Sequence, residues 1–298
     1  MIIVIFAYFF LAIVAVGDKY LLTGSLNPKT YTFYAGAFGA IVFLLIPFVN
    51  FYIPSPAIIL VSFLAGAVFV LATFIFYSAL EDFEVSRVVP AVGGLMPIFT
   101  LVLVFLLFED ANLLKISDFL ALALLILGTF LITKGVPAKI SLKSFLMAGV
   151  SAFLFSAYFV LSKYLYNLLP FWSAIILIRF GAFVSAMFFI FAADVRAEIF
   201  GKRPSSMNIR TAALFGANQT LAATGVILQN FSIAVAGTSY LAIINATEGI
   251  RYVFVFIFSI IISLKFPNIL KEEMSRKIII QKLIAIFLIV GGLGALAL

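Results

Sequence analysis

The sequence predicts an all-α polytopic membrane protein with ten transmembrane helices, arranged as two inverted five-helix repeats. The composition is the first reason, since 65% of the 298 residues are hydrophobic and only 10% are charged. A water-soluble domain of this length could not bury so much apolar surface. The second reason is that the apolar residues gather in ten segments, each of which must be helical in lipid to satisfy its backbone hydrogen bonds. The third is a faint internal repeat.

The ten segments follow one another with short connections, and most connections contain Pro, Gly or Asn, which end helices. About 20 apolar residues suffice to cross a bilayer. The predicted spans of the first half are residues 2–22, 31–50, 57–80, 86–108 and 116–133, and those of the second half are residues 142–166, 171–193, 209–233, 239–263 and 278–298. We therefore expect residues 1–135 to form the first repeat and residues 141–298 the second.

The repeat is visible in short matches that occur in the same order, the first two of them at nearly the same offset. Residues 16–21 resemble residues 160–165, residues 36–38 resemble residues 181–183, and residues 126–128 resemble the end of the last span at Val290 and Gly291. Chance similarity between apolar segments is the alternative. Because five spans is an odd number, the second half must enter the membrane inverted. Inverted repeats place a substrate site near the midplane and support alternating access.

Several classes of function are excluded by residue type. The chain has no Cys and no His, which removes thiol chemistry, disulfides, imidazole catalysis and the common zinc ligand sets. We expect no metal site and no cofactor. The net charge of +7 comes mainly from Lys and Arg in the connections, so it does not indicate nucleic-acid binding. No phosphate-binding loop is present, so ATP-driven transport would need another subunit.

The ninth span carries two charges near its middle, Glu248 and Arg251. Placing a charged side chain at that depth costs at least about 2.5–3.5 kcal/mol. Such a residue therefore usually has an ion-pair partner, faces a hydrated cavity or has a functional role. Of the twelve acidic residues, Glu248 alone is expected to be deeply embedded. It could bind a cation or take up a proton as the coupling ion, or it could only neutralise Arg251 or Arg179. Two Arg and one Glu would make the centre positive if no other acid reaches it, and that would favour an anionic substrate group.

Polar residues recur on the predicted inner faces of several spans. In the ninth span Asn245, Glu248 and Tyr252 share one helical face. The eighth span adds Asn218 and Gln219, the third adds Tyr77 and the sixth adds Tyr158. Together with Arg179 and Arg251 these residues could line one central cavity. The alternative is that such residues only hold helices together.

The fourth span contains a candidate hinge. Pro90 and Pro97 lie seven residues apart with Gly93 and Gly94 between them. Proline removes a backbone donor and clashes with the preceding turn, so we expect the helix to kink or break here. A gate and a static kink are both compatible with this pattern.

The stretches Tyr77–Leu80, Val85–Pro90 and Leu95–Thr100 resemble the third and fourth helices of the EamA-type family in the drug/metabolite transporter superfamily. Glu109 resembles the acidic residue after the fourth helix of that family, and the segment from Asp118 onward resembles its fifth helix. Lys19 and Arg179 fall at places that resemble its basic positions. Tyr34 and Phe108 depart from the pattern. The resemblance implies a five-plus-five transporter of small molecules, which exports amino acids or related compounds.

The two indications of orientation disagree. The odd-numbered connections hold fifteen Lys and Arg, whereas the even-numbered ones hold only Lys115 and Lys163. The positive-inside rule then places both termini outside, whereas the resemblance places them in the cytoplasm.

The function expected from the sequence is a secondary transporter in the plasma (inner) membrane. It would contact lipid and a small-molecule substrate, with protons as a candidate coupling ion. A structural or partner-binding subunit is the main alternative. A membrane-embedded lipid-handling enzyme is less favoured, because no paired intramembrane carboxylates are expected.

Overall fold

The computed structural model describes residues 2–24, 26–83, 85–108, 116–133, 142–200, 208–265 and 276–295. Every regular element in these ranges is helical, as the composition predicts. Glu109, assigned by resemblance to the family pattern, lies outside the described residues. The elements are α1 (Ile2–Gly24), α2 (Pro28–Gly39), η1 (Ala40–Phe48), α3 (Pro56–Asp82), α4 (Val85–Leu107), α5 (Ile116–Thr133), α6 (Leu142–Leu168), α7 (Phe171–Met187), η2 (Phe188–Phe191), α8 (Ala193–Phe200), α9 (Ile209–Val235), η3 (Thr238–Tyr240), α10 (Leu241–Ala246), α11 (Gly249–Lys265) and α12 (Arg276–Ala295).

Seven helical segments in the described ranges are long and apolar enough to cross a membrane, so the chain is a multi-pass membrane protein. Three of the ten predicted spans, the fourth, fifth and tenth, are present there only as shorter apolar helices. That all ten cross the bilayer therefore stays a prediction. The seven segments are Ile2–Leu22, Pro28–Phe48, Pro56–Asp82, Phe145–Leu168, Phe171–Phe191, Ile209–Val235 and Thr238–Phe258.

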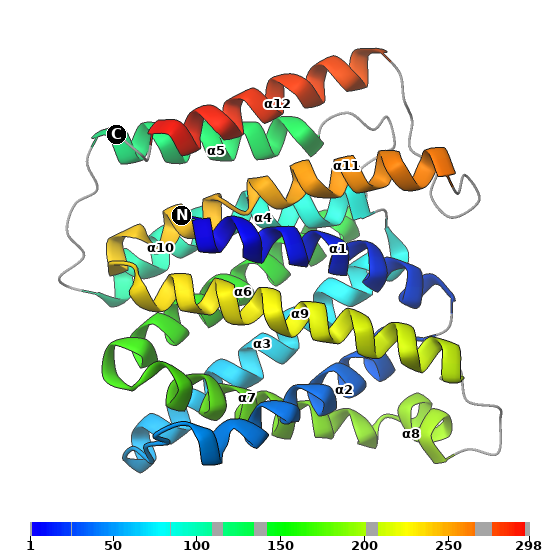
Figure 1. Ribbon diagram of the computed structural model, residues 1–298, viewed down its shortest axis with the longest axis vertical. Helices are drawn as coiled ribbons and strands as arrows, with labels where there is room; N and C mark the ends of the chain where they lie inside the picture. The colour runs from blue at the N-terminus through cyan, green and yellow to red at the C-terminus, as the bar shows by residue number, and fades with distance from the viewer. Residues whose placement is uncertain are drawn as a thin grey trace.

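The long helices lie roughly side by side (Figure 1). α5 and α12 pair at one edge of the bundle, and α2, α7 and the short α8 lie at the other. Between them α1 packs on α9, and α6 packs on both α3 and α4. The start of α1 and the end of α12 are at the same end of the molecule in this view.

Two helices, one in each half, begin with an Asn side chain that caps the helix N-terminus. Asn27 precedes α2, and its side chain accepts a hydrogen bond from Thr30 N at 2.9 Å. Asn208 does the same for α9, accepting from Thr211 N at 2.9 Å. An Asn cap satisfies one of the amide groups that have no partner within the helix. In α2 the first helical residue is also Pro28, whose ring already has the helical φ angle.

A second feature common to both halves is a lysine that caps a neighbouring helix. Lys19 Nζ, near the end of α1, donates to Leu80 O at 2.6 Å and Phe83 O at 3.1 Å, where α3 ends. Lys163 Nζ, near the end of α6, donates to two carbonyls at the end of α9, Ala234 O at 3.1 Å and Ala236 O at 2.5 Å. A cation is favourable at a helix C-terminus, where carbonyl groups lack intrahelical donors.

The α5–α12 pair has a self-complementary contact. A methyl group on Gly128 of α5 would lie 2.9 Å from Ala285 O and 2.7 Å from the Ile289 side chain of α12. A methyl group on Gly292 of α12 would lie 3.0 Å from Ala121 O and 2.8 Å from the Leu125 side chain of α5. In each case the later glycine of one helix meets the earlier residues of the other, so the two helices run antiparallel. Glycine is required on both sides for the backbones to approach this closely.

The fourth span was expected to kink or break; it does not break, and the kink stays a prediction. α4 is a continuous helix from Val85 to Leu107 and runs through Pro90 and Pro97. Pro97 leaves the carbonyl of Gly93 without its intrahelical donor, and the absence of a side chain there makes room for a neighbour. A methyl group on Gly93 would overlap the Tyr252 hydroxyl. Gly94 is less crowded, since its added methyl group would only touch Thr129 at 3.5 Å. The interruption falls in the ninth span instead.

Candidate functional site

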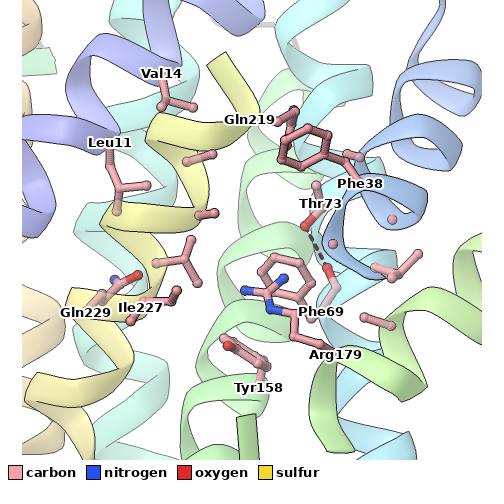
Figure 2. Close-up of a pocket in the computed structure, with 18 of the residues that line it drawn as sticks. Leu11, Val14, Phe38, Phe69, Thr73, Tyr158, Arg179, Gln219, Ile227 and Gln229 are labelled. Carbon is pink, nitrogen blue, oxygen red and sulfur yellow. Dashed lines mark hydrogen bonds between the residues drawn. The ribbon is translucent and has the colours of Figure 1, made fainter. Parts of the chain in front are cut away.

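A cavity of about 600 Å³ lies inside the bundle. Residues from α1, α2, η1, α3, α4, α6, α7 and α9 form its wall, together with Glu248 and Arg251. Most of the wall is apolar and rich in Phe, as is usual for small-molecule sites. Figure 2 shows part of the wall, with α9 on one side and Phe69, Tyr158 and Arg179 on the other. Six of the nine predicted substrate or coupling residues line it, namely Tyr77, Tyr158, Arg179, Gln219, Glu248 and Arg251.

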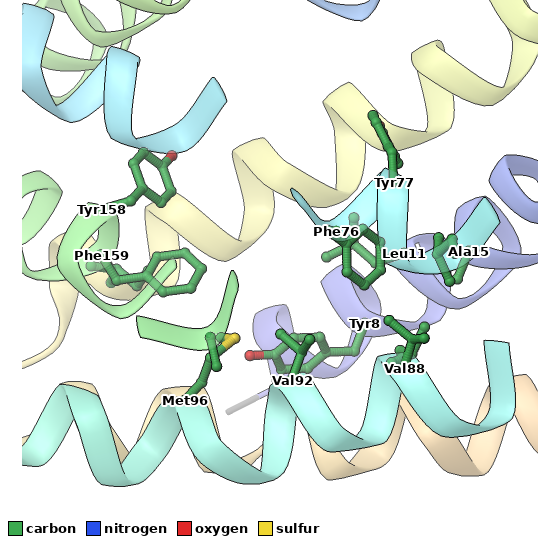
Figure 3. Close-up of a cluster of buried hydrophobic side chains, with 14 of the residues drawn as sticks. Tyr8, Leu11, Ala15, Phe76, Tyr77, Val88, Val92, Met96, Tyr158 and Phe159 are labelled. Carbon is green, nitrogen blue, oxygen red and sulfur yellow. The ribbon is translucent and has the colours of Figure 1, made fainter. Parts of the chain in front are cut away.

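The apolar wall also belongs to the core of the protein. Leu11 of α1, Phe76 of α3, Val92 and Met96 of α4, and Phe159 of α6 line the cavity and are buried against one another (Figure 3). Four helices therefore converge on this wall, and their packing holds the polar residues of the cavity in place.

The ninth span is interrupted at Glu248, contrary to the single helix predicted there. α10 ends at Ala246 and α11 starts at Gly249, with Thr247 and Glu248 in a turn between them. Around this turn the backbone hydrogen bonds join residues three positions apart. Glu248 N donates to Asn245 O at 3.1 Å, and Arg251 N donates to Glu248 O at 2.8 Å. An interrupted helix at membrane depth exposes backbone groups only where protein or a cavity surrounds it.

The carbonyl that the interruption releases is satisfied by side chains. Ile244 O accepts from Thr247 Oγ1 at 2.6 Å and from Tyr8 OH of α1 at 3.0 Å. Because Gly249 has no side chain, the turn can pack closely against α5. A methyl group at this position would lie 2.8 Å from Thr129 Oγ1 of α5. The turn is thus held by α1 on one side and by α5 on the other.

Glu248 forms an ion pair with Arg251, which was one of its two expected partners. Arg251 Nη1 lies 2.9 Å from Glu248 Oε1, and both side chains are largely buried. Arg251 Nε also donates to Leu11 O of α1 at 3.2 Å. The second carboxylate oxygen, Oε2, is buried without a hydrogen-bond partner among the described residues. Because a buried carboxylate oxygen without a partner is costly, this atom is a candidate for binding a proton or a substrate donor.

Arg179 reaches the cavity from α7 and has a different environment. Its guanidinium lies over the Phe69 ring, 4.5 Å from the ring centre. Among the described residues no carboxylate lies within ion-pair distance of it. A cation held over an aromatic face keeps its hydrogen-bond donors available. Arg179 can therefore receive an anionic group.

Asp18 is the residue of this site that the sequence analysis missed. It is 3% exposed, within the first membrane segment, and it lines the cavity. The expectation that Glu248 alone is deeply embedded is therefore wrong. The positive centre was expected only if no other acid reached it, and Asp18 brings a second carboxylate to face the two Arg. Asp18 lies six residues before the end of α1, so it was assigned to a helix end. Its neighbour Lys19 does reach the helix boundary, whereas Asp18 turns inward.

Asp18 links α1 to α2 and α9. Its Oδ1 accepts hydrogen bonds from Tyr31 OH at 2.6 Å and from Asn218 Nδ2 at 2.7 Å. Gln219 Nε2 lies 3.4 Å from the same Tyr31 hydroxyl. Tyr77 packs its ring edge-on against that of Tyr31, with ring centres 4.7 Å apart. Asn218 is thus close to the cavity through Asp18 without lining it.

Two predicted residues of the ninth span lie away from the cavity. Asn245 is fully buried and donates to Thr100 Oγ1 of α4 at 2.8 Å. Tyr252 is buried over Gly93 of α4. Both lie between the interrupted span and α4, so they hold these two elements together, as the packing alternative predicted. The turn at Thr247 and Glu248 alters the helical face that sequence spacing had assigned to them.

Tyr158 connects the cavity wall to a second polar group. Its hydroxyl donates to Asn230 Oδ1 of α9 at 3.0 Å, and Tyr166 OH donates to the same oxygen at 2.9 Å. Asn230 in turn donates to Val226 O of its own helix at 2.8 Å. The Tyr158 ring also lies 4.9 Å from that of Phe69, beside Arg179. In the described ranges, no group of His, Cys, Asp or Glu could hold a metal ion.

These features define an all-helical, multi-pass membrane protein with charged residues around an internal cavity. Residues 1–134 match the model of the EamA-like transporter family, which confirms the resemblance to the drug/metabolite transporter superfamily. The match covers somewhat less than half of the chain. No curated protein matches the chain.

Solved structures share the fold. Twenty-two chains match, and one of them, titled "Crystal structure of protein", is 16% identical and has a TM-score of 0.67. The match covers 99% of this chain and 98% of that one. The similarity therefore extends over both halves of the molecule, beyond the residues matched by the family model. At this level of identity it concerns the fold alone.

Proposed function

We propose that the protein is a secondary transporter that moves a small metabolite, such as an amino acid or a related compound, by alternating access. The observation that carries this proposal is the cavity of about 600 Å³ with Asp18, Arg179, Glu248 and Arg251 on its wall. Charged residues inside a membrane protein are expensive and usually mark a transport path. Export from the cell across the plasma membrane is the direction that the family resemblance favours.

Alternating access requires two halves that can exchange roles, and the paired contacts of the two halves support this. Lys19 and Lys163 cap the third long helix of their own halves, α3 and α9. α5 and α12, the last helix of each half, meet antiparallel through Gly128 and Gly292. Both relations are those of inverted repeats, whose interface forms a substrate site near the midplane. We therefore propose that residues 1–135 and 141–298 are the two repeats of a ten-helix bundle.

The two sides of the cavity differ in the way that an alternating mechanism requires. α3 and α7 are in close contact, since a methyl group on Gly66 would overlap Ala182 N. The corresponding pair, α2 and α9, is joined by side chains, with Phe215 of α9 against the rings of Tyr31 and Tyr34. We refer to the α3–α7 contact and the α2–α9 contact as the two seams, and we propose that they close in turn.

The charges suggest how substrate and coupling ion are divided. Arg179 has no carboxylate partner among the described residues and receives the carboxylate of the substrate. Glu248 has one oxygen bound to Arg251 and one without a partner in the described part of the chain, so it takes up the coupling proton or a substrate ammonium group. An amino acid carries both groups that this arrangement binds.

The test is flux into proteoliposomes with a panel of amino acids, nucleosides and organic cations, with and without a proton gradient. Glu248→Gln keeps the shape of the side chain but removes its charge, and we expect it to abolish or uncouple transport while expression stays intact. Asp82→Asn is the control, because Asp82 is paired with Lys143 at the surface. Transport by Glu248→Gln at the wild-type rate would mean that the carboxylate is structural.

The alternative is a structural or partner-binding membrane subunit, which would have a dry and fully packed interior. The cavity and the buried Glu248 oxygen without a partner favour transport over this alternative. No flux of any compound in the panel, together with a clear loss of stability in Glu248→Gln, would favour the structural role.

A further inference from the structure

The cavity wall contains residues that are also exposed on the outside of the bundle. Ile41 and Leu44 of η1 line the cavity and are 52% and 69% exposed. Thr220 and Ala223 of α9 likewise line the cavity and are exposed. A residue that belongs both to a cavity and to the outer surface lies at an opening. We refer to these four residues as the portal.

The portal is at membrane depth. Thr220 and Ala223 are near the middle of α9, which has 27 residues, and Ile41 and Leu44 lie within the membrane segment Pro28–Phe48. A helix rises about 1.5 Å per residue, so both α9 residues are roughly 15–20 Å from its first residue. At that distance from the helix end, the surroundings of the outer surface are acyl chains.

The polar atoms at the portal are satisfied without water. Thr220 Oγ1 donates to Gly216 O at 2.8 Å, and Thr224 Oγ1 donates to Thr220 O at 3.0 Å, both within α9. Hydroxyls bonded to their own helix tolerate an apolar environment. The space beside the portal is open, because a methyl group added to Gly39 or Gly216 would have no atom within 4 Å. On the other side of the cavity, Gly66 and Gly181 bring α3 and α7 into close contact and leave no such opening.

We propose that the substrate enters or leaves sideways, through the portal, as a membrane-dissolved organic anion with an apolar chain or ring system. This rests on the transport function proposed above, but it replaces the water-soluble amino acid given there as an example with an amphiphilic anion as the substrate class. The anionic group binds Arg179, whose guanidinium has no carboxylate partner in the described part of the chain. The apolar body lies along the aromatic and aliphatic wall of the same cavity, which includes Phe38 and Phe69. Such an amphiphile partitions into the bilayer, so its route does not have to begin in water.

The chain offers a direct way to observe occupancy, because it has a single Trp. In a Trp172→Phe background, Phe69→Trp places a fluorescent reporter under Arg179 and keeps the aromatic face for the cation. A nitroxide-labelled fatty acid at pH 9 serves as the anionic amphiphile, and its methyl ester is the uncharged probe with the same chain. Phe287→Trp in the same background is the lipid reporter, since Phe287 is on the outer surface of α12.

In nanodiscs we expect the fatty acid to quench the reporter at position 69 more strongly than its ester does, and both probes to quench the reporter at position 287 equally. Arg179→Gln should reduce the apparent affinity for the acid by about tenfold to a hundredfold, because a charged hydrogen-bonded partner is lost. Ala223→Phe should fill the portal and slow quenching at position 69. Ala213→Phe is the matched control, an exposed alanine of the same helix that does not line the cavity.

Three results would overturn the proposal: equal quenching by acid and ester at position 69, no effect of Ala223→Phe relative to Ala213→Phe, or quenching at that position only by a water-soluble nitroxide. The assay measures occupancy and not flux. Quenching without transport would therefore refute the transport function and keep the binding site. Flux of a water-soluble metabolite without quenching would refute the portal and keep the transport function.

Discussion

At the scale of single residues, the cavity separates its charges into three environments. Glu248 is paired with Arg251, Asp18 is held by two neutral donors, and Arg179 lies over an aromatic ring. Buried charge pairs seldom add stability, because the loss of hydration offsets the attraction between them. The groups without a full set of partners, Arg179 and one oxygen of Glu248, are therefore the ones available for a ligand.

Asp18 provides the first prediction at this scale. Asp18→Asn keeps the acceptor oxygen for Tyr31 and Asn218 but removes the charge, so we expect nearly unchanged thermal stability and a loss of gradient-driven flux. Asp18→Leu removes the acceptor as well and leaves two buried donors without a partner, which should cost about 1–3 kcal/mol of stability. Thermal unfolding in detergent and proteoliposome flux measure the two effects.

The control for Asp18 is Ser162→Ala. Ser162 occupies the matching place in the second half, and its buried hydroxyl has no partner among the described residues. Removing it should change neither stability nor flux. Normal coupling in Asp18→Asn would show that Asp18 only holds α2 and α9 together.

At the scale of helices, the interruption of the ninth span is the feature that shapes the site. It brings Glu248 to the cavity and turns Asn245 and Tyr252 toward α4. Proline was the obvious marker for an interruption, and it is present in α4, which is continuous. The turn at Thr247–Gly249 forms instead where tertiary partners, Tyr8 of α1 and Thr129 of α5, can satisfy or accommodate it.

The lysine caps lead to a prediction for the helix ends. Lys19→Met and Lys163→Met each remove a cation that donates to two terminal carbonyls, so each should lower stability by about 1.5–3 kcal/mol. Lys143→Met is the control, because Lys143 is exposed and its ion pair with Asp82 should contribute at most about 1 kcal/mol. Denaturant or thermal unfolding measures all three. A strong effect at Lys19 alone would contradict an equivalent role of the two lysines.

The α5–α12 contact leads to a prediction for helix packing. Gly128→Val would place methyl groups against Ala285 and Ile289, and overpacking of this kind costs about 1–3 kcal/mol. Gly291→Val is the matched control, since it is on the other face of α12 with no atom near an added methyl group. Both variants change helix propensity by the same amount, so the difference in melting temperature isolates the contact. Equal melting temperatures would show that α5 and α12 can separate at little cost.

At the scale of the whole molecule, the inverted arrangement proposed above would make the two sides of the cavity similar without making them identical. Gly66 and Gly181 allow the α3–α7 seam to close through the backbone, whereas Phe215 and its aromatic neighbours fill the α2–α9 seam. A seam closed by side chains can open by rotamer changes and small helix shifts, whereas a seam with backbones in contact must move as a unit. We therefore expect the α2–α9 side to be the more mobile one.

Membrane orientation is a prediction at the same scale. The start of α1 and the end of α12 are at one end of the bundle (Figure 1), so reporters fused to the two termini should give the same result. The basic connections predict that this end is outside the cytoplasm. A phosphatase and a fluorescent-protein fusion at each terminus measure this. Fluorescence without phosphatase activity at both termini would instead support the orientation implied by the resemblance.

The sequence was sufficient for the features that depend on local composition. Hydropathy located the apolar segments, and the cost of burying charge singled out Glu248, Arg251 and Arg179, all of which line the cavity. Short matches also pointed to Lys19 and Lys163 as equivalent positions. The inferences from hydropathy and from charge hold because membrane insertion acts on each segment largely by itself, so the residues of that segment carry the information.

Only the tertiary structure decided which polar residues meet. Asp18 is buried because α2 and α9 close over it, and its partner Asn218 is 200 residues away along the chain. The opening at Ile41 and Ala223 depends in the same way on how far α2 and η1 stand from α9. Spacing within one helix predicts which residues share a face, but the neighbour of that face is set by the packing of distant segments. That packing made Asp18 and the portal part of the site and removed Asn245 and Tyr252 from it.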